Sequence, residues 1–238
     1  MTIPIQSQIY NPITGVFGTG QIQVFGVGQS GSWAVPNGIG KVRVRLWGAG
    51  GGGSSNGGGG GGFALKTIYD LSGVSSIAVT VGNGGTGNGA TSSFGSYVSA
   101  TGGLSGVNGG TGGSGVGGDI NASGGLGSGT SYPAGAGSLW GNGGGNNGNS
   151  IGASGSGVNS SNTPLPNGFL GVSSFYASTS GVVPPTNGMP IFSIDFIGIG
   201  GAGSYYFSGI NGGGGYYGGY PGGGGYQTGA PGMVIVEF

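Results

Sequence analysis

Stretches of alternating hydrophobic and polar residues occur towards both ends of the chain and predict β-strands. Residues 41–47, 63–69 and 76–81 alternate strictly, and a shorter stretch at 21–25 does the same. Because successive side chains of a strand point to opposite faces, this pattern gives each strand one apolar face. The last residues, 233–238, are apolar on both faces, which is typical of a strand inside a sheet. We therefore predict that the terminal strand pairs with an early strand and closes the domain.

The chain offers no stretch with the apolar spacing of a helix. Glycine occupies 71 of the 238 positions, and each glycine in a helix interior costs about 1 kcal/mol relative to alanine. The predicted fold class is therefore all-β and irregular, with a β-strand framework and essentially no α-helix.

Glycine tracts separate the predicted strands, and several place a non-glycine residue at every third position. The triplet occurs at 83–86, 101–104, 108–114 and 123–126. Three residues per turn is the period of polyproline II, which has no internal hydrogen bonds. Glycine-lined edges let such helices touch and exchange N–H and C=O bonds, which buried backbone requires. We predict a packed bundle of polyglycine II helices bordered by the strands, with 57–62 as its most enclosed member.

Low-complexity disorder is the main alternative, because so much glycine is typical of it. Zero net charge and a hydrophobic share of 34% argue for a folded chain instead, since disordered chains are usually charged and poor in apolar residues.

The titratable side chains are too few for most site chemistry. The chain has four Lys or Arg, four Asp or Glu, and neither His nor Cys. It therefore lacks an imidazole base, a thiolate nucleophile and soft metal ligands, and its few cations neutralise few phosphates. We predict no enzyme activity, no cofactor, no metal site and no nucleic-acid partner. No apolar run reaches membrane-spanning length, so membrane insertion is not expected.

Composition divides the chain into two parts, the second of which contains an insertion. Residues 1–30 are predicted to be an N-terminal attachment segment or edge strand, and residues 31–238 a glycine-rich domain. Within that domain, an insertion at about 159–197 is poor in glycine and rich in proline and aromatic residues. The start of the chain does not resemble a secretory signal peptide. We therefore expect the protein to be assembled inside the cell that makes it.

The order of several motifs resembles the glycine-rich domain of bacteriophage tail-fibre and tail-tip proteins. The residues that carry the resemblance come in this order: the run 30–53, the glycine run 57–62 with Phe63–Lys66, the pieces 79–85, 91–95, 100–103 and 117–121, and the ending 232–238. The expected bundle is also similar to the tip adhesins of T-even-type phages. The resemblance implies a virion protein at a tail-fibre or tail tip that binds a bacterial lipopolysaccharide or outer-membrane protein, with residues 1–30 contacting other tail proteins. A structural virion component, such as a decoration or fibre-joining protein, is the alternative, and an ice-binding or matrix protein is a third.

The candidate receptor-binding residues are aromatic. Six of the 11 tyrosines lie close together near the end of the chain, and tyrosine suits sugar or protein contacts because it joins a flat apolar ring to a hydroxyl. Trp140 lies on a predicted loop tip. Packing at the bundle edge is the competing interpretation for all of these residues, which are Tyr205, Tyr206, Tyr216, Tyr217, Tyr220, Tyr226 and Trp140.

Charged residues offer weaker candidates. Lys41, Arg43 and Arg45 share one strand face, which suits either phosphate binding or, as we favour, a solvated surface. Asp119 and Asp195 are expected to cap loops rather than bind calcium, since neither lies in an Asp-rich loop.

Overall fold

A computed structural model describes residues 20–53, 56–106, 108–127, 133–139, 141–145 and 221–238, and the backbone of 152–153 and 156–157. This described part contains strands and no helix. The predicted all-β class is therefore confirmed for the described residues. The predicted insertion at about 159–197 lies outside them.

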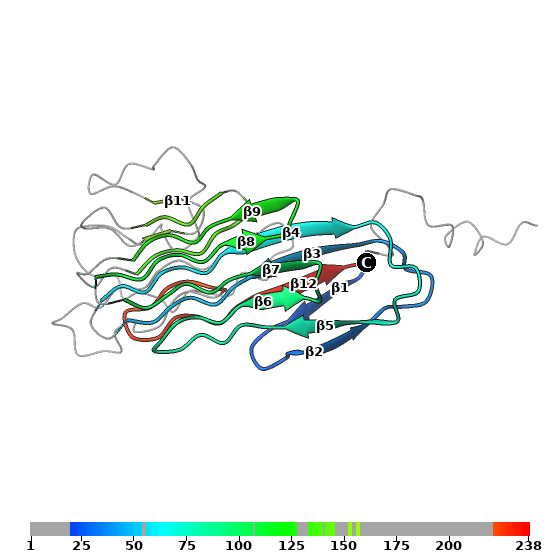
Figure 1. Ribbon diagram of the computed structural model, residues 1–238, viewed down its shortest axis with the longest axis horizontal. Coiled ribbons are helices and arrows are strands. Elements are labelled where there is room, and N and C mark those ends of the chain that lie inside the picture. Colours follow the sequence, from blue (N-terminus) through cyan, green and yellow to red (C-terminus); the bar gives the residue numbers. More distant parts are fainter. Residues whose placement is uncertain are drawn as a thin grey trace, which may run out of the picture.

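Two five-stranded antiparallel sheets form a sandwich at one end of the molecule (Figure 1). The first sheet has the order β1-β12-β3-β4-β9, and its strands are Ile22–Phe25, Met233–Glu237, Val42–Trp47, Phe63–Ile68 and Ile120–Ala122. The second has the order β2-β5-β6-β7-β8, and its strands are Gly31–Ala34, Ser76–Thr80, Ser92–Phe94, Val98–Ala100 and Gly115–Val116. A separate antiparallel pair is formed by β10 and β11, at Gly152–Ala153 and Ser156–Gly157.

The terminal strand lies inside the first sheet, as its apolar faces predict. β12 pairs on one side with β1, where Ile22 faces Glu237, and on the other with β3, where Trp47 faces Met233. β1 is one of the two edge strands of this sheet, and Gln21 and Phe238 exchange two main-chain hydrogen bonds beside it. Residues 21 and 238 therefore lie together at the sandwich end.

The apolar faces of the two sheets meet in one core. Trp33 is its largest side chain, and its ring lies 5.7 Å from that of Phe94 and 5.4 Å from that of Phe238. Val44 and Val236 contribute from the first sheet and Val79 from the second, all buried. This core anchors the strands from which the glycine tracts extend.

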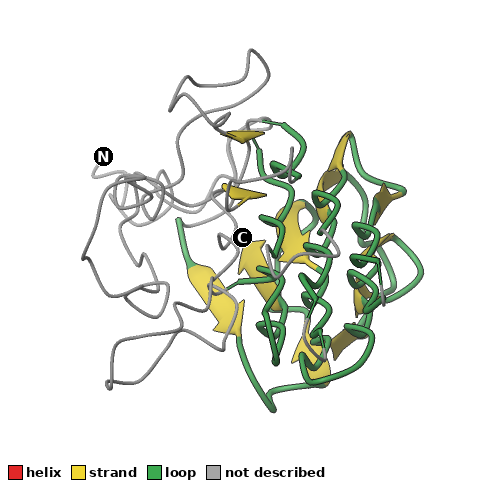
Figure 2. Cartoon of the chain, turned by 90° about the vertical axis from the view of Figure 1, so that its left-hand side faces the viewer, coloured by secondary structure: helices red, strands yellow, loops and turns green. Residues whose placement is uncertain are grey.

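Most strands of the sandwich continue directly into glycine tracts at the other end of the molecule (Figure 1). β3 leads into 48–53, and the chain returns through 57–62 to β4. Tracts follow β5, β7 and β9 and precede β6, β8 and β12 in the same way. Figure 2 looks along the tracts from their far end and shows them packed side by side in an array.

The tract 57–62 is buried throughout and lies at the centre of the array, as predicted for the six-glycine run. Its N–H groups at Gly59 and Gly62 donate to Leu104 and Thr101. The register therefore advances by three residues in both tracts. Five further tracts bond to it, which completes a set of six neighbours: 48–51, 101–104, 110–113, 123–127, 134–137 and 222–225.

These six neighbours form a closed ring, because each is also hydrogen-bonded to the next. The bonds that close it are Gly103 to Ala49, Leu104 to Thr111, Gly124 to Gly113, Gly125 to Gly135, Gly224 to Ala134, and Gly225 to Gly51, N–H donor named first. Around the ring, the central tract alternately accepts from one neighbour and donates to the next. It thus satisfies its N–H groups at 58–62 and its C=O groups at 57–62 without forming a sheet.

Side chains are excluded from this array by the close approach of the tracts. A Cβ on Gly60 would fall on the carbonyl of Gly135, and one on Gly59 on the carbonyl of Thr111. Outer tracts do carry side chains: along 108–114, Asn108, Thr111 and Ser114 are exposed while Gly110 and Gly113 are buried. Burial and hydrogen bonding therefore share a period of three residues. The assignment of the tracts as polyglycine II helices stays a prediction.

We expect Gly60→Ala to destabilise the fold severely. The added methyl group must displace the main chain of Gly135, and overpacking of this kind costs about 1–3 kcal/mol or more. The matched control is Gly85→Ala, because Gly85 lies in another tract and a Cβ there meets nothing within 4 Å. Thermal unfolding followed by circular dichroism measures both. Equal stability of the two variants would contradict the close packing described above.

Candidate functional site

Of the candidate receptor-binding residues, Tyr226 alone lies within the described residues. It is half-buried, in the turn between tracts 221–225 and 228–232, at the end of the array furthest from the sandwich. The other six candidates are outside the described part of the chain, namely Tyr205, Tyr206, Tyr216, Tyr217, Tyr220 and Trp140.

The turns between paired tracts gather at that same end, which we call the tract tips (Figure 1). Their described residues are Gly53 and Asn56, Thr86–Asn88, Ser105–Gly109 apart from residue 107, and Tyr226–Gln227. The tips contact one another: Asn88 Oδ1 accepts hydrogen bonds from Ser105 N, at 2.9 Å, and from Ser105 Oγ, at 3.1 Å. Neighbouring turns are thereby held in fixed positions and present a joint surface.

The described tips are polar but uncharged. Thr86, Asn88 and Gln227 are exposed, and all described Lys, Arg, Asp and Glu residues belong to the strands or to the turns and loops next to them. The tips therefore offer hydroxyl and amide groups, with Tyr226 as their described aromatic residue, and suit recognition by hydrogen bonds rather than by charge.

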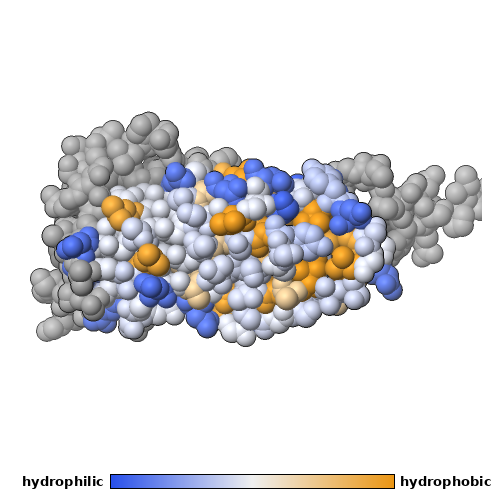
Figure 3. Space-filling view, viewed as in Figure 1, coloured by the Kyte–Doolittle hydropathy of each residue, from blue (hydrophilic) through white to orange (hydrophobic). Residues whose placement is uncertain are grey.

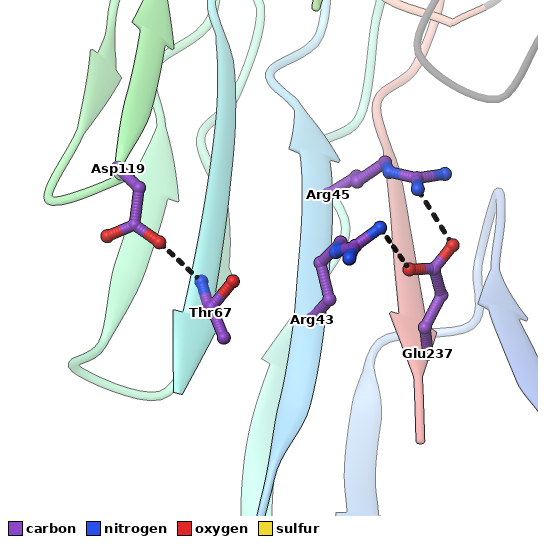
Figure 4. A network of polar contacts seen from close by, with 5 residues as sticks. All are labelled: Arg43, Arg45, Thr67, Asp119 and Glu237. Carbon is purple, nitrogen blue, oxygen red and sulfur yellow. Dashed lines mark hydrogen bonds and ion pairs between the residues drawn. The ribbon is translucent and has the colours of Figure 1, made fainter. Parts of the chain in front are cut away.

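Most of the described charged side chains make contacts within the sandwich. Glu237 of β12 accepts from two arginines of β3, with Oε1 at 2.8 Å from Arg45 Nη2 and Oε2 at 3.4 Å from Arg43 Nη1 (Figure 4). Arg45 is 8% exposed, between Ile235 and Leu65 on the neighbouring strands. Its burial lowers the pKa of the guanidinium, which the nearby Glu237 carboxylate partly offsets.

The interpretation of this strand face as a solvated surface is wrong for Arg45. The reason is that the outer face of the first sheet is itself packed near the tracts: Trp47 lies 4.9 Å from Phe63, ring to ring, and donates its indole N–H to Gly137. Lys41 also has a partner, since its Nζ lies 4.8 Å from the centre of the Tyr69 ring. The arginines therefore hold β3 and β12 together.

Asp119 is expected to cap a loop, but its carboxylate bonds to a strand instead. Its Oδ2 accepts a hydrogen bond from Thr67 N at 2.7 Å, which ties the β8–β9 turn to β4 (Figure 4). Asp195 lies outside the described residues. Within the described residues, no group of three or more His, Cys, Asp or Glu side chains is placed to hold a metal ion.

Sequence reasoning missed a set of exposed side chains on one side of the array. Leu104 is 44% exposed and Leu126 53% exposed, although both belong to recognised triplets. The three-residue period predicts that the non-glycine residues of a tract lie along one edge. Whether that edge is exposed depends on which tracts lie beside it.

A family model described as a glycine-rich domain matches residues 25–238, and no curated protein matches the chain. The match begins within β1 and extends through β12, so it includes both sheets and the described tracts. In the described part of the chain, no helix is long and apolar enough to cross a membrane.

We expect Glu237→Gln to lower the free energy of unfolding by about 3 kcal/mol, because it leaves the buried Arg45 without its counter-charge. Arg43→Gln is the matched control: the Arg43 side chain is 32% exposed, so its removal is expected to cost about 1 kcal/mol or less. Urea unfolding of both variants measures the difference. Equal losses of unfolding free energy in the two variants would show that the Glu237 carboxylate does not stabilise the buried charge of Arg45.

Proposed function

The chain belongs to the glycine-rich domain family over residues 25–238. From the resemblance of its motif order to tail-fibre and tail-tip domains, we propose that it is a receptor-binding protein of a bacteriophage tail-fibre or tail tip. It binds a bacterial surface glycan or outer-membrane protein through its tract tips, without catalysis. It is part of the virion and assembles in the host cytoplasm.

The observation that carries this proposal is that the described part of the attachment segment and the tract tips lie at opposite ends of the domain. Residue 21, which belongs to the proposed attachment segment 1–30, lies beside residue 238 at the sandwich end. The tract tips lie at the opposite end (Figure 1). An attachment at the sandwich end therefore leaves the tips as the free end.

The main-chain bonding of the tracts also supports a binding role. The tips are short turns on a framework whose backbone bonds are made between tracts, so little ordering of the framework is needed when a partner binds. Such preorganisation reduces the entropic cost of association. Binding turns on a rigid scaffold are also where recognition is usually found.

A structural virion component is the second candidate, and a different feature favours it. β1 is an edge strand whose outward apolar residues Ile22 and Val24 are each 38% exposed. No charged residue lies on β1, and uncharged edge strands accept a further strand readily. A fibre protein would then contact the sandwich rather than the tips.

Single-cysteine labelling distinguishes the two candidates, because the sequence contains no cysteine. Gln227→Cys places a thiol on an exposed tip, and Asn37→Cys places one on an exposed turn of the sandwich end. Each variant is coupled to maleimide polyethylene glycol, and adsorption of the protein to bacterial cells is measured.

We expect the polymer to abolish adsorption when it is attached at 227 and to leave adsorption intact at 37. Adsorption that survives labelling at 227, or no adsorption of unlabelled protein to any strain of a broad bacterial panel, would contradict the proposal.

A further inference from the structure

One side of the tract array exposes side chains in a regular pattern. In three adjacent tracts, at 101–104, 108–114 and 123–126, every third residue is exposed, or half-buried in the case of Ser123. We call the resulting surface the triplet face, and its residues are Thr101, Leu104, Thr111, Ser114, Ser123 and Leu126.

Main-chain bonds set these residues in two rows. Leu104 N donates to Thr111 O at 2.8 Å, and Gly127 N donates to Gly110 O at 2.8 Å. Thr111 is therefore flanked by Leu104 on one side and Leu126 on the other. This first row is largely apolar.

The second row lies three residues nearer the sandwich and consists of hydroxyl groups. Thr101 Oγ1 accepts from Ser114 N at 2.8 Å, and Ser114 Oγ lies 3.4 Å from Ser123 Oγ. Ser123 N in turn donates to Asn142 Oδ1 at 2.9 Å. These contacts fix the hydroxyl-bearing residues across four tracts. At the polyproline II rise, the two rows are about 9 Å apart.

The face and its surroundings carry no charge among the described residues. The described charged side chains lie on β3, β4 and β12, just before β3, just after β4, and in the β8–β9 turn. In Figure 3 the tract half is mostly pale, with small apolar spots, whereas most apolar surface lies over the sandwich. Charged ligands thus find no counter-charge on this face, and the partner that complements it is neutral.

We propose that the triplet face binds a neutral polysaccharide of the bacterial surface, a step that rests on the proposed receptor-binding function and names its ligand class. The apolar row packs against the C–H faces of the sugar rings, and the hydroxyl row exchanges hydrogen bonds with their hydroxyl groups. A repeating polymer matches a surface that repeats across rigid tracts better than an irregular protein surface does. The tips then contact the end or branch of the same chain.

The test uses immobilised bacterial polysaccharides as probes, a set of neutral O-polysaccharides and a set of acidic capsular polysaccharides. The double variant Leu104→Ser with Leu126→Ser removes the apolar row. Its matched control is Val116→Ser with Ile120→Ser, because these residues are 51% and 41% exposed on β8 and β9 of the sandwich. Circular dichroism checks that both variants fold.

We expect the unmodified protein and the control to bind at least one neutral polysaccharide, and the triplet variant to bind it at least about tenfold more weakly, since each leucine loses apolar contact area. Three results would overturn the inference: binding to acidic polysaccharides alone, binding unchanged in the triplet variant, or binding to no neutral polysaccharide of the panel. The protein could bind no neutral polysaccharide and still adsorb to cells. If labelling at residue 227 then blocks that adsorption, the receptor-binding proposal stands and the receptor is a protein.

Discussion

The structure depends on the close approach of main chains, which the absence of Cβ atoms permits. Around 57–62, six tracts come near enough to exchange N–H and C=O bonds, and a methyl group on Gly58 or Gly60 would fall on the carbonyl of a neighbour. In a β-sheet a strand bonds to two neighbours at most, whereas this tract bonds in six directions. The array is thus held by backbone groups and has a core without side chains.

Such an array needs an anchor, because glycine loses more backbone freedom on folding than any other residue. The sandwich supplies it. Its core around Trp33 and Val44 buries apolar surface, which is the main driving force that the glycine half lacks. β3 and β4 are paired in register up to Trp47 and Phe63, and they deliver 48–53 and 57–62 side by side. The contact of Glu237 with Arg43 and Arg45 fixes the position of β12 at the same sheet.

The sequence predicts those parts whose signal is carried by side chains. β3, β4 and β5 follow from their alternation, β12 follows from its apolar residues on both faces, and the enclosed position of 57–62 follows from its lack of any side chain. Which tract lies beside which is not predictable in this way, because glycine residues that bond through the main chain look alike. The exposure of Leu104 and Leu126 follows from that tract order. The pairing of Arg45 with Glu237 follows from the register of β12 on β3. The sequence pattern predicts neither. Six of the seven predicted receptor-binding residues lie outside the described residues, and the role of Tyr226 stays a prediction.

The most direct measurement is amide hydrogen exchange, residue by residue, in the tract 57–62. If its N–H groups are bonded within a cooperative array, those of Gly58 to Gly62 exchange only when the whole domain unfolds, as slowly as the N–H groups of Val44 and Val236 in the sheet. Exchange of these glycine amides at the rate of an exposed turn, with the sheet still protected, would show that the tracts are not joined by their main chains and would contradict the account.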